Sequence, residues 1–137
     1  MSVELFKPFR LLLNPALYAI GFFGFICWII FLADSGRRSV FFDLVQHLPY
    51  GDKLGHAGLF GTLALLANVS FGFRYLKRPW IQVGSLAVLT FAFGEELTQY
   101  FFPQRAMDLS DAVADFFGVS IATLVSIWLR PIAARPQ

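Results

Sequence analysis

Charged side chains are scarce in this chain of 137 residues, where Asp, Glu, Lys and Arg together make up 15% of the sequence. Soluble domains carry about 25%. Hydrophobic residues reach 57%, so the composition excludes an ordinary soluble domain and favours a membrane protein of one domain, residues 1–137. The net charge of +2, spread along the chain, provides no basic patch of the kind that binds nucleic acid.

Cysteine is almost absent as well. Cys27 is the only one, which excludes an intrachain disulfide, and its place in an apolar run indicates a small side chain facing lipid or a neighbouring helix. The sequence also lacks a phosphate-binding glycine loop and the CxxC and HExxH patterns of metal sites. No metal site is therefore predicted from a motif.

Long apolar runs are what the chain has instead. About 20 residues at ~1.5 Å each cross a hydrocarbon layer of ~30 Å. We predict an all-α membrane protein with four transmembrane helices: Ala16–Ala33, Leu54–Phe73, Trp80–Phe102 and Leu109–Leu129. A cleaved signal peptide is the alternative for the first run, but that run is too long, and Phe31 and Ala33 do not form a small-x-small cleavage site.

The connection Asp34–Lys53 contains one amphipathic stretch. Four of its apolar residues recur at the spacing of one helical face: Phe41, Leu44, Val45 and Leu48. Pro49 and Gly51 are expected to end this helix. A short helix lying in the membrane interface is predicted between the first two spans, where it serves as an anchor or as a lid over a site.

Lysine and arginine are enriched on the cytoplasmic side of membrane proteins. One side of the predicted bundle holds seven of them: Lys7, Arg10, Arg74, Lys77, Arg78, Arg130 and Arg135. The other side holds four: Arg37, Arg38, Lys53 and Arg105. This difference predicts that both termini lie in the cytoplasm and that the protein is a multi-pass component of the cell membrane.

Small residues at helical spacing predict close packing of two of the spans. The second span carries Gly55, Gly58 and Gly61, and the fourth carries Ala114, Gly118, Ala122 and Ser126. We expect these faces to lie against neighbouring helices.

Ionisable residues gather near one end of three predicted spans. At ~1.5 Å per residue, Glu96 lies about 24 Å from the inner membrane edge, and His56 and Asp111 about 26 Å. Asp115 lies deeper, at about 20 Å. We therefore expect His56, Glu96 and Asp111 to meet just beneath the outer head groups. A charged side chain at the centre of the hydrocarbon costs at least ~2.5 kcal/mol, so a cluster of this kind indicates a functional site.

Residue spacing places further polar side chains beside these three. Three sets share a helix face: Asp52 with His56, Glu96 with Gln99, and Asp108 with Asp111 and Asp115. Lys53 and Arg105 reach the same region, although cations at helix ends commonly extend to the head groups without a further role. Asp108 and Asp111 also suit a helix N-terminus, and Glu95 is expected to be solvated.

Four short patterns follow one another along the chain: D-K-x-x-H (Asp52, Lys53, His56), E-x-x-Q (Glu96, Gln99), P-x-R (Pro103, Arg105) and D-x-x-D with a later glycine (Asp108, Asp111, Gly118). Together they resemble the VanZ-like family of small membrane proteins over residues 52–129, three of the four spans. Asp115 departs from the family, which usually has Asn at that position. The resemblance implies a multi-pass membrane protein whose best-known relative confers low-level teicoplanin resistance, and it supplies no established reaction.

The mixture of polar groups at head-group depth favours an enzyme acting on the head group of a phospholipid or a lipid-linked cell-envelope precursor. The predicted catalytic residues are His56, Glu96 and Asp111, of which His56 and Glu96 are acid and base. The predicted substrate-binding residues are Lys53, Gln99, Arg105 and Asp108, with Asp52 and Asp115 in support. Lys53 and Arg105 suit phosphate, and the carboxylates of Asp108 and Asp111 leave a divalent cation open as a cofactor.

Two other functions stay open. A non-catalytic binder of lipid head groups or of an antibiotic needs Lys53 and Arg105 but no acid–base pair. A proton or cation pathway is typical of intramembrane carboxylates, yet the inner half of the spans offers few polar residues and no ionisable relay: Asn68, Ser70, Gln82, Ser85 and Thr123.

Overall fold

The computed structural model describes residues 14–37, 39–103 and 105–133, without the side chains of Phe41 and of residues 131–133. Every element in these ranges is helical: α2 (Pro15–Asp34), α3 (Val40–Gln46), α4 (Gly51–Ser70), α5 (Val83–Thr98), the 3₁₀ helix η1 (Gln99–Phe101) and α6 (Leu109–Ala133). Four of the Lys and Arg residues counted in the prediction of orientation lie outside the described residues: Lys7, Arg10, Arg38 and Arg135.

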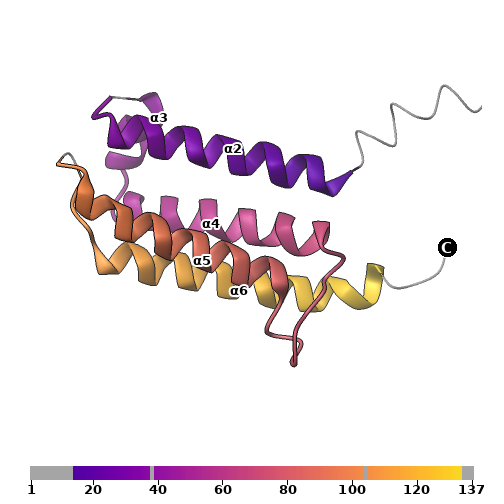
Figure 1. Ribbon diagram of the computed structural model, residues 1–137. Helices are drawn as coiled ribbons and strands as arrows, with labels where there is room; N and C mark the ends of the chain where they lie inside the picture. The colour runs from indigo at the N-terminus through magenta and orange to yellow at the C-terminus, as the bar shows by residue number, and fades with distance from the viewer. Residues whose placement is uncertain (1–13, 38, 104, 134–137) are drawn as a thin grey trace, which may run out of the picture.

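The four long helices lie side by side, and each runs opposite to the one before it in the chain (Figure 1). The last turn of α2, the first turn of α4, the last turn of α5 and the first turn of α6 therefore meet at one end of the bundle. The short α3 lies at the same end, which we call the α3 end. α4 is the central element because it contacts α2, α3, α5 and α6.

The third helix is shorter than its apolar run predicts. It begins at Val83 and not at Trp80. The preceding residues form a turn in which the Val83 amide donates to the Arg74 carbonyl at 3.0 Å, and an antiparallel β-bridge joins Tyr75 to Gln82. Because these backbone groups are engaged within the turn, the helix starts only after it. At the other end η1 continues the helical path of α5 for three more residues.

The connection between α2 and α4 is helical over seven residues. Leu48, predicted on the apolar face of this helix, lies beyond its end, where its amide donates to the Val45 carbonyl at 3.1 Å in a turn. The side chains of Leu44 and Leu48 are exposed, whereas Val45 is half-buried. α3 therefore presents one side to the bundle and leaves apolar side chains uncovered on the other.

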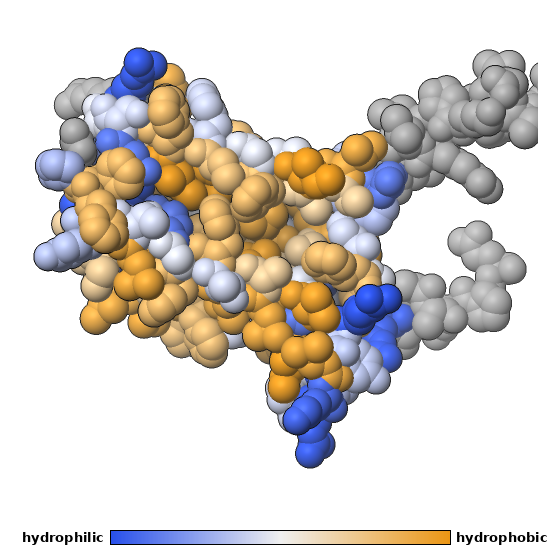
Figure 2. Space-filling model, viewed as in Figure 1, coloured by the Kyte–Doolittle hydropathy of each residue, from blue (hydrophilic) through white to orange (hydrophobic). Residues whose placement is uncertain are grey.

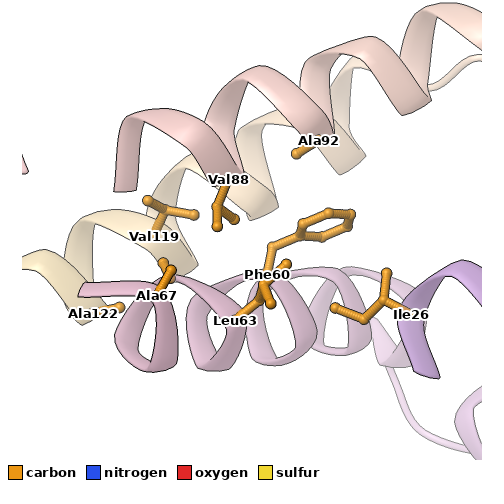
Figure 3. Close-up of a cluster of buried hydrophobic side chains, with 9 residues drawn as sticks. Ile26, Phe60, Leu63, Ala67, Val88, Ala92, Val119 and Ala122 are labelled. Atoms are coloured by element: carbon orange, nitrogen blue, oxygen red, sulfur yellow. The ribbon is translucent and has the colours of Figure 1, made fainter. Parts of the chain in front are cut away.

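The apolar core lies among the four long helices (Figure 3). Its buried members are Ile26 of α2, Phe60, Leu63, Ala64 and Ala67 of α4, Val88 and Ala92 of α5, and Val119 and Ala122 of α6. Alanines make up nearly half of the cluster, and side chains this small let helix backbones approach one another closely.

α4 and α6 cross in direct backbone contact. A Cβ atom added to Gly118 would overlap the carbonyl group of Ala57, and one added to Gly61 would lie 2.8 Å from the Gly118 carbonyl oxygen. The predicted close packing of these two faces is confirmed at this crossing. Gly58, in the middle of the predicted stripe, has no atom within 4 Å of its Cβ position, so it takes no part in the contact.

A buried hydrogen-bond network joins α4, α5 and α6 in the half of the bundle away from α3. The Asn68 amide nitrogen donates to the Ser85 hydroxyl at 2.8 Å and to the Ser126 hydroxyl at 3.2 Å. The Asn68 carbonyl oxygen accepts from the Ser85 backbone amide at 2.9 Å, and the Ser85 and Thr123 hydroxyls lie 2.7 Å apart. This network satisfies the buried side chains of Asn68, Ser85, Thr123 and Ser126.

Apolar side chains cover much of the outer surface as well as the core. Figure 2 shows them over the middle of the bundle, with hydrophilic residues gathered towards its two ends. Two helices, Pro15–Asp34 and Leu109–Arg130, are long and apolar enough to cross a membrane. In the most apolar stretch of each helix, only 11% of the first helix and 33% of the second are buried within the bundle. Their apolar faces are therefore largely uncovered, which fits a membrane protein better than a soluble core.

Candidate functional site

The predicted site residues meet at the α3 end of the bundle. With Asp34 and Glu95 they form a connected set that we call the polar end cluster: Asp34 from α2; Asp52, Lys53 and His56 from α4; Glu95 and Glu96 from α5; Gln99 from η1; Arg105 and Asp108 from the loop that follows; and Asp111 and Asp115 from α6. The antiparallel arrangement brings these helix ends together, because alternate helix termini fall at the same end of the bundle.

Lys53 joins three carboxylates. Its ammonium group lies 2.8 Å from Asp52 Oδ2, 2.7 Å from Asp108 Oδ2 and 2.5 Å from Asp111 Oδ1. An ammonium group has three hydrogens, so each can serve one of these oxygens. The side chain is 25% exposed, and the three bonds tie the start of α4 to the start of α6.

His56 lies between two aspartates of α6. Its Nδ1 is 3.1 Å from Asp115 Oδ1, and its Nε2 is 3.7 Å from Asp111 Oδ2. The imidazole stacks on Phe60 with ring centroids 6.0 Å apart. The shorter contact favours the tautomer with a proton on Nδ1, donated to Asp115, which leaves Nε2 able to accept a proton. A histidine oriented in this way by a carboxylate is typical of acid–base sites.

Glu96 binds the backbone of the residue that precedes α6. One of its carboxylate oxygens accepts the Asp108 backbone amide at 2.7 Å, and the other accepts from the Gln99 side-chain amide at 3.1 Å. Glu96 is only 2% exposed. The structure therefore places Glu96 within the polar end cluster, with both oxygens engaged in bonds to the protein.

Glu95 is buried, and the expectation that water solvates it is wrong. It is 6% exposed because the chain folds back after η1 and brings Arg105 over it. The Arg105 guanidinium donates to Glu95 Oε1 and to Asp34 Oδ1, both at 3.0 Å. The Gln99 amide also donates to both oxygens of Glu95, at 3.1 and 3.0 Å. Arg105 thus ties the end of α2 to the end of α5.

Carboxylates outnumber cations in the polar end cluster. Seven carboxylates belong to it: Asp34, Asp52, Glu95, Glu96, Asp108, Asp111 and Asp115. Against them stand Lys53 and Arg105, together with His56 when protonated. Hydrogen bonds from Lys53 and Ser110 hold the pKa of the Asp108 carboxyl well below its usual range, so this group is ionised at neutral pH. The cluster therefore has a negative formal balance even though its cations bridge several of its members.

A pocket of about 190 Å³ opens beside the cluster, between α2, α3 and α4. Its apolar wall comes from α2 and α3: Ile26, Ile29, Ile30, Ala33, Phe42 and Val45. Its polar wall includes His56, Asp52, Glu95 and Arg105. We call it the α2–α4 pocket. It can hold a molecule with an apolar portion and a polar end, since both kinds of surface line one space.

Metal binding finds little support in the geometry. No group of three or more His, Cys, Asp or Glu side chains within residues 14–37, 39–103 and 105–133 is arranged to hold a metal ion. Asp108 and Asp111, the pair from which the sequence leaves a divalent cation open, both bond to Lys53. The ammonium group occupies the position at which a cation would join them.

Asp34 and Glu95 are the members of the cluster that sequence reasoning did not assign to a site. Arg105 lies 71 residues from Asp34 and 10 from Glu95. Neither separation corresponds to a helical repeat, so the only signal in the sequence was the acidic character of each residue.

Comparison with protein-family models, curated proteins and solved structures finds no match.

Proposed function

We propose that this chain is a VanZ-like membrane protein with four spans, both termini in the cytoplasm and the polar end cluster in the outer leaflet. α2 and α6 have the length and apolar surface of spans. α4, with 20 residues, is about 30 Å long at 1.5 Å per residue. α5 contributes about 24 Å and η1 about 6 Å more, so all four match a hydrocarbon layer of ~30 Å.

We further propose that the α2–α4 pocket binds a lipid head group and that His56 exchanges a proton with it. The observation that carries this proposal is the position of His56, which lines a pocket with an apolar wall while its ring is held by Asp115. A lipid at the end of the bundle would lay its chain along α2 and direct its head group towards the imidazole. The substrate class is a phospholipid or a lipid-linked cell-envelope precursor.

The roles within this site follow from the bonds that each residue makes. His56 Nε2 is the proton acceptor, and Asp115 fixes the orientation of the ring. Asp111, at 3.7 Å from Nε2, stabilises the imidazolium once it forms. Glu96 is a positioning residue, because its two oxygens accept hydrogen bonds from Gln99 in η1 and from the Asp108 backbone amide before α6. Gln99, bonded to both glutamates, supports the same wall.

The head group favoured by the cluster is one with hydrogen-bond donors or a positive charge. Lys53 and Arg105 are predicted to bind phosphate. All three hydrogens of Lys53 serve carboxylates, so a phosphate there would have to displace these partners. Arg105 uses two of its five N–H groups for Asp34 and Glu95 and lines the pocket, so it is the better placed of the two for phosphate. An ammonium group or sugar hydroxyls would instead complement the surplus of carboxylate oxygens.

Turnover by purified protein in liposomes tests the proposal. The liposomes should contain phosphatidylethanolamine, phosphatidylglycerol and an undecaprenyl-linked precursor, with products followed by mass spectrometry. We expect one lipid to be converted, and His56→Ala to lower the rate by about 100-fold or more, the usual contribution of a positioned acid–base group. His47→Ala is the matched control, since His47 is the other histidine of the chain and is exposed after α3. Equal product profiles for the wild type and His56→Ala would exclude catalysis by this residue.

Binding without chemistry is the second candidate, and the surplus of carboxylates favours it. A site that only holds a cationic or hydroxylated head group needs acceptors but no proton transfer. His56→Gln distinguishes the two functions because glutamine retains hydrogen bonding but does not titrate. If the protein is an enzyme, this variant should lose turnover. If it only binds lipid, the variant should keep most of its affinity. Native mass spectrometry of the lipids that co-purify with the protein measures this affinity.

A further inference from the structure

Positive charge collects at the end of the bundle opposite α3. Three cations lie in the turn between α4 and α5 and one in the last turn of α6, and we call them the basic patch: Arg74, Lys77, Arg78 and Arg130. The eight carboxylates of the described residues lie in α3 or in the half of the bundle beside it: Asp34, Asp43, Asp52, Glu95, Glu96, Asp108, Asp111 and Asp115. Among the described residues no ion pair includes a member of the patch. Its charge is therefore open to a partner outside this part of the chain.

The turn that carries three of these cations has an ordered backbone. The Leu76 amide donates to the Ile81 carbonyl at 2.9 Å, and the β-bridge joins Tyr75 to Gln82. Gln82 is 1% exposed, so the base of the turn packs against the bundle. Figure 1 shows the turn extending past α6, and Figure 2 shows hydrophilic residues at its tip beside hydrophobic ones. The cations are therefore presented on a structured projection.

Two aromatic rings lie beneath cations of the basic patch. The Arg130 guanidinium carbon is 4.3 Å from the centroid of the Tyr75 ring, which joins the end of α6 to the turn. The Arg78 guanidinium carbon is 5.6 Å from the centroid of the Trp80 ring. A ring contacts the flat face of a guanidinium and leaves the N–H groups at its edge free for an acceptor. Trp80 and Leu76 are 61% and 56% exposed, so apolar side chains accompany the free cations.

This combination of side chains selects the partner. Tryptophan is enriched where a membrane meets water, and Trp80 and Leu76 can enter that layer while lysine and arginine extend to the lipid phosphates. The patch also adjoins the uncovered apolar face of α6, so lipid is the partner nearest to it. An acidic protein or a nucleic acid would match the charge but would leave these apolar side chains without a place in the bilayer.

We propose that the basic patch binds the phosphate groups of anionic phospholipids in the leaflet at this end of the bundle. Each lysine or arginine near an anionic surface strengthens binding by about fivefold, and four of them gathered on two elements discriminate anionic from zwitterionic lipid. The surface depends on the bundle lying in a membrane. It does not depend on chemistry or binding at His56, which lies at the other end.

Fluorescence quenching by brominated lipids tests the proposal on the full-length protein. Trp28→Phe and Trp128→Phe leave Trp80 as the only tryptophan, and both replaced side chains are exposed. The protein is placed in phosphatidylcholine liposomes that contain either brominated phosphatidylglycerol or brominated phosphatidylcholine. We expect the anionic lipid to be preferred around Trp80 by about fivefold or more. The preference should fall between about 0.1 M and 1 M NaCl, as the screening length shortens from ~10 Å to ~3 Å. Equal quenching by the two lipids would overturn the proposal.

Substitutions assign the preference to the patch. Arg74→Gln should lower it by up to about fivefold, the contribution of one cation, and Lys77→Gln combined with Arg78→Gln should nearly abolish it. The swap Lys77→Arg with Arg78→Lys keeps the charge and should keep the preference. Arg37→Gln is the matched control for Arg74→Gln, because Arg37 is an exposed arginine that follows α2 at the α3 end. An equal loss in Arg37→Gln, or no loss in the Lys77 and Arg78 double variant, would overturn the proposal.

His56→Ala separates this surface from the proposed head-group site. The variant should keep the full preference for phosphatidylglycerol around Trp80 even if it loses turnover or binding at the α2–α4 pocket. A preference lost in His56→Ala and retained in the double variant would assign the anionic lipid to that pocket and overturn the role of the basic patch.

Discussion

Each cation of the polar end cluster is shared among several carboxylates. Lys53 serves three and Arg105 serves two. Sharing matters most for Asp111 and Glu95, whose side chains are only 14% and 4% exposed, because a buried charge needs an opposite charge or hydrogen bonds to stabilise it. Removal of one cation therefore affects more than one element of the fold.

Substitution of Lys53 by methionine should lower the stability of the fold by about 2–3 kcal/mol, since breaking a buried ion pair by removing one partner costs at most about 3–5 kcal/mol and this side chain is partly exposed. Repulsion between the remaining carboxylates of Asp108 and Asp111 adds to the loss. Unfolding by sodium dodecyl sulfate in mixed micelles, monitored by circular dichroism, measures the change. Lys77→Met, in the exposed turn before α5, is the control; equal stability of the two variants would contradict the role of Lys53.

The level at which the cluster residues lie was predictable, whereas the partners of Arg105, Asp34 and Glu95, were not. Helical rise alone gave a common level for His56, Glu96 and Asp111, because the depth of a residue along a helix follows from its number in the sequence. The burial of Glu95 could not be read in this way. It depends on the path of the loop that carries Arg105, and the spacing of residues in the sequence does not predict the path of a loop.

At the scale of helices, the crossing of α4 and α6 sets the geometry of the site, because Lys53 and His56 on one helix meet Asp111 and Asp115 on the other. The distance between these groups depends on how closely the two backbones approach at Gly118. A change at the crossing should therefore shift these groups directly, because Asp115 lies three residues from Gly118 and His56 is next to Ala57, the residue that Gly118 contacts.

Gly118→Ala should destabilise the protein by about 1–3 kcal/mol, the usual cost of overpacking a tight interface. Gly58→Ala should be neutral or should stabilise it by up to about 1 kcal/mol, because it adds helix propensity without a clash. Thermal unfolding in detergent compares the pair. Equal melting temperatures would show that α4 and α6 are not in close contact at this position.

The buried network around Asn68 provides a second prediction for the helices. Asn68→Ala should cost about 2 kcal/mol, because the Ser85 backbone amide loses its acceptor in a buried position. Thr90→Ala is the control, since Thr90 is an exposed residue of α5 whose hydroxyl bonds to its own helix. The same unfolding assay applies; a loss no greater than that of the control would mean that water or another group replaces Asn68.

The ends of two helices differ from those that the hydrophobic pattern predicted. The apolar run from Trp80 predicted a longer third helix because Trp80 and Ile81 are apolar. In the structure they belong to a turn closed by backbone bonds from Arg74 to Val83. Such a turn depends on backbone geometry that hydropathy does not encode. Leu48 was likewise assigned to α3 by spacing, although the helix ends two residues earlier.

At the scale of the whole molecule, the apolar surface and the polar ends indicate how the bundle sits in a membrane. All-helical architecture was predictable from composition and run length, since apolar runs that lie in lipid, where there is no water, must satisfy their backbone internally. The number of spans and their direction stay predictions, which labelling from one side of the membrane tests.

Cysteine labelling measures the direction of the spans. Replacing Cys27 by alanine removes the only thiol, so that Ser35→Cys and Lys77→Cys can each be added alone to that background. In intact cells a membrane-impermeant maleimide should label Ser35→Cys, at the α3 end, and should label Lys77→Cys only after permeabilisation. The opposite pattern would place the polar end cluster in the inner leaflet, and labelling of both in intact cells would exclude four spans.

The bond between Arg105 and Asp34 also has a consequence for biogenesis. The two residues are 71 positions apart, so at roughly 5–20 residues per second the ribosome adds Arg105 about 4–14 s after Asp34. Throughout that interval α2 lacks the guanidinium that later joins it to α5. The α2–α4 pocket, which Arg105 lines, is therefore completed late in synthesis, and nascent chains truncated before Arg105 should lack it.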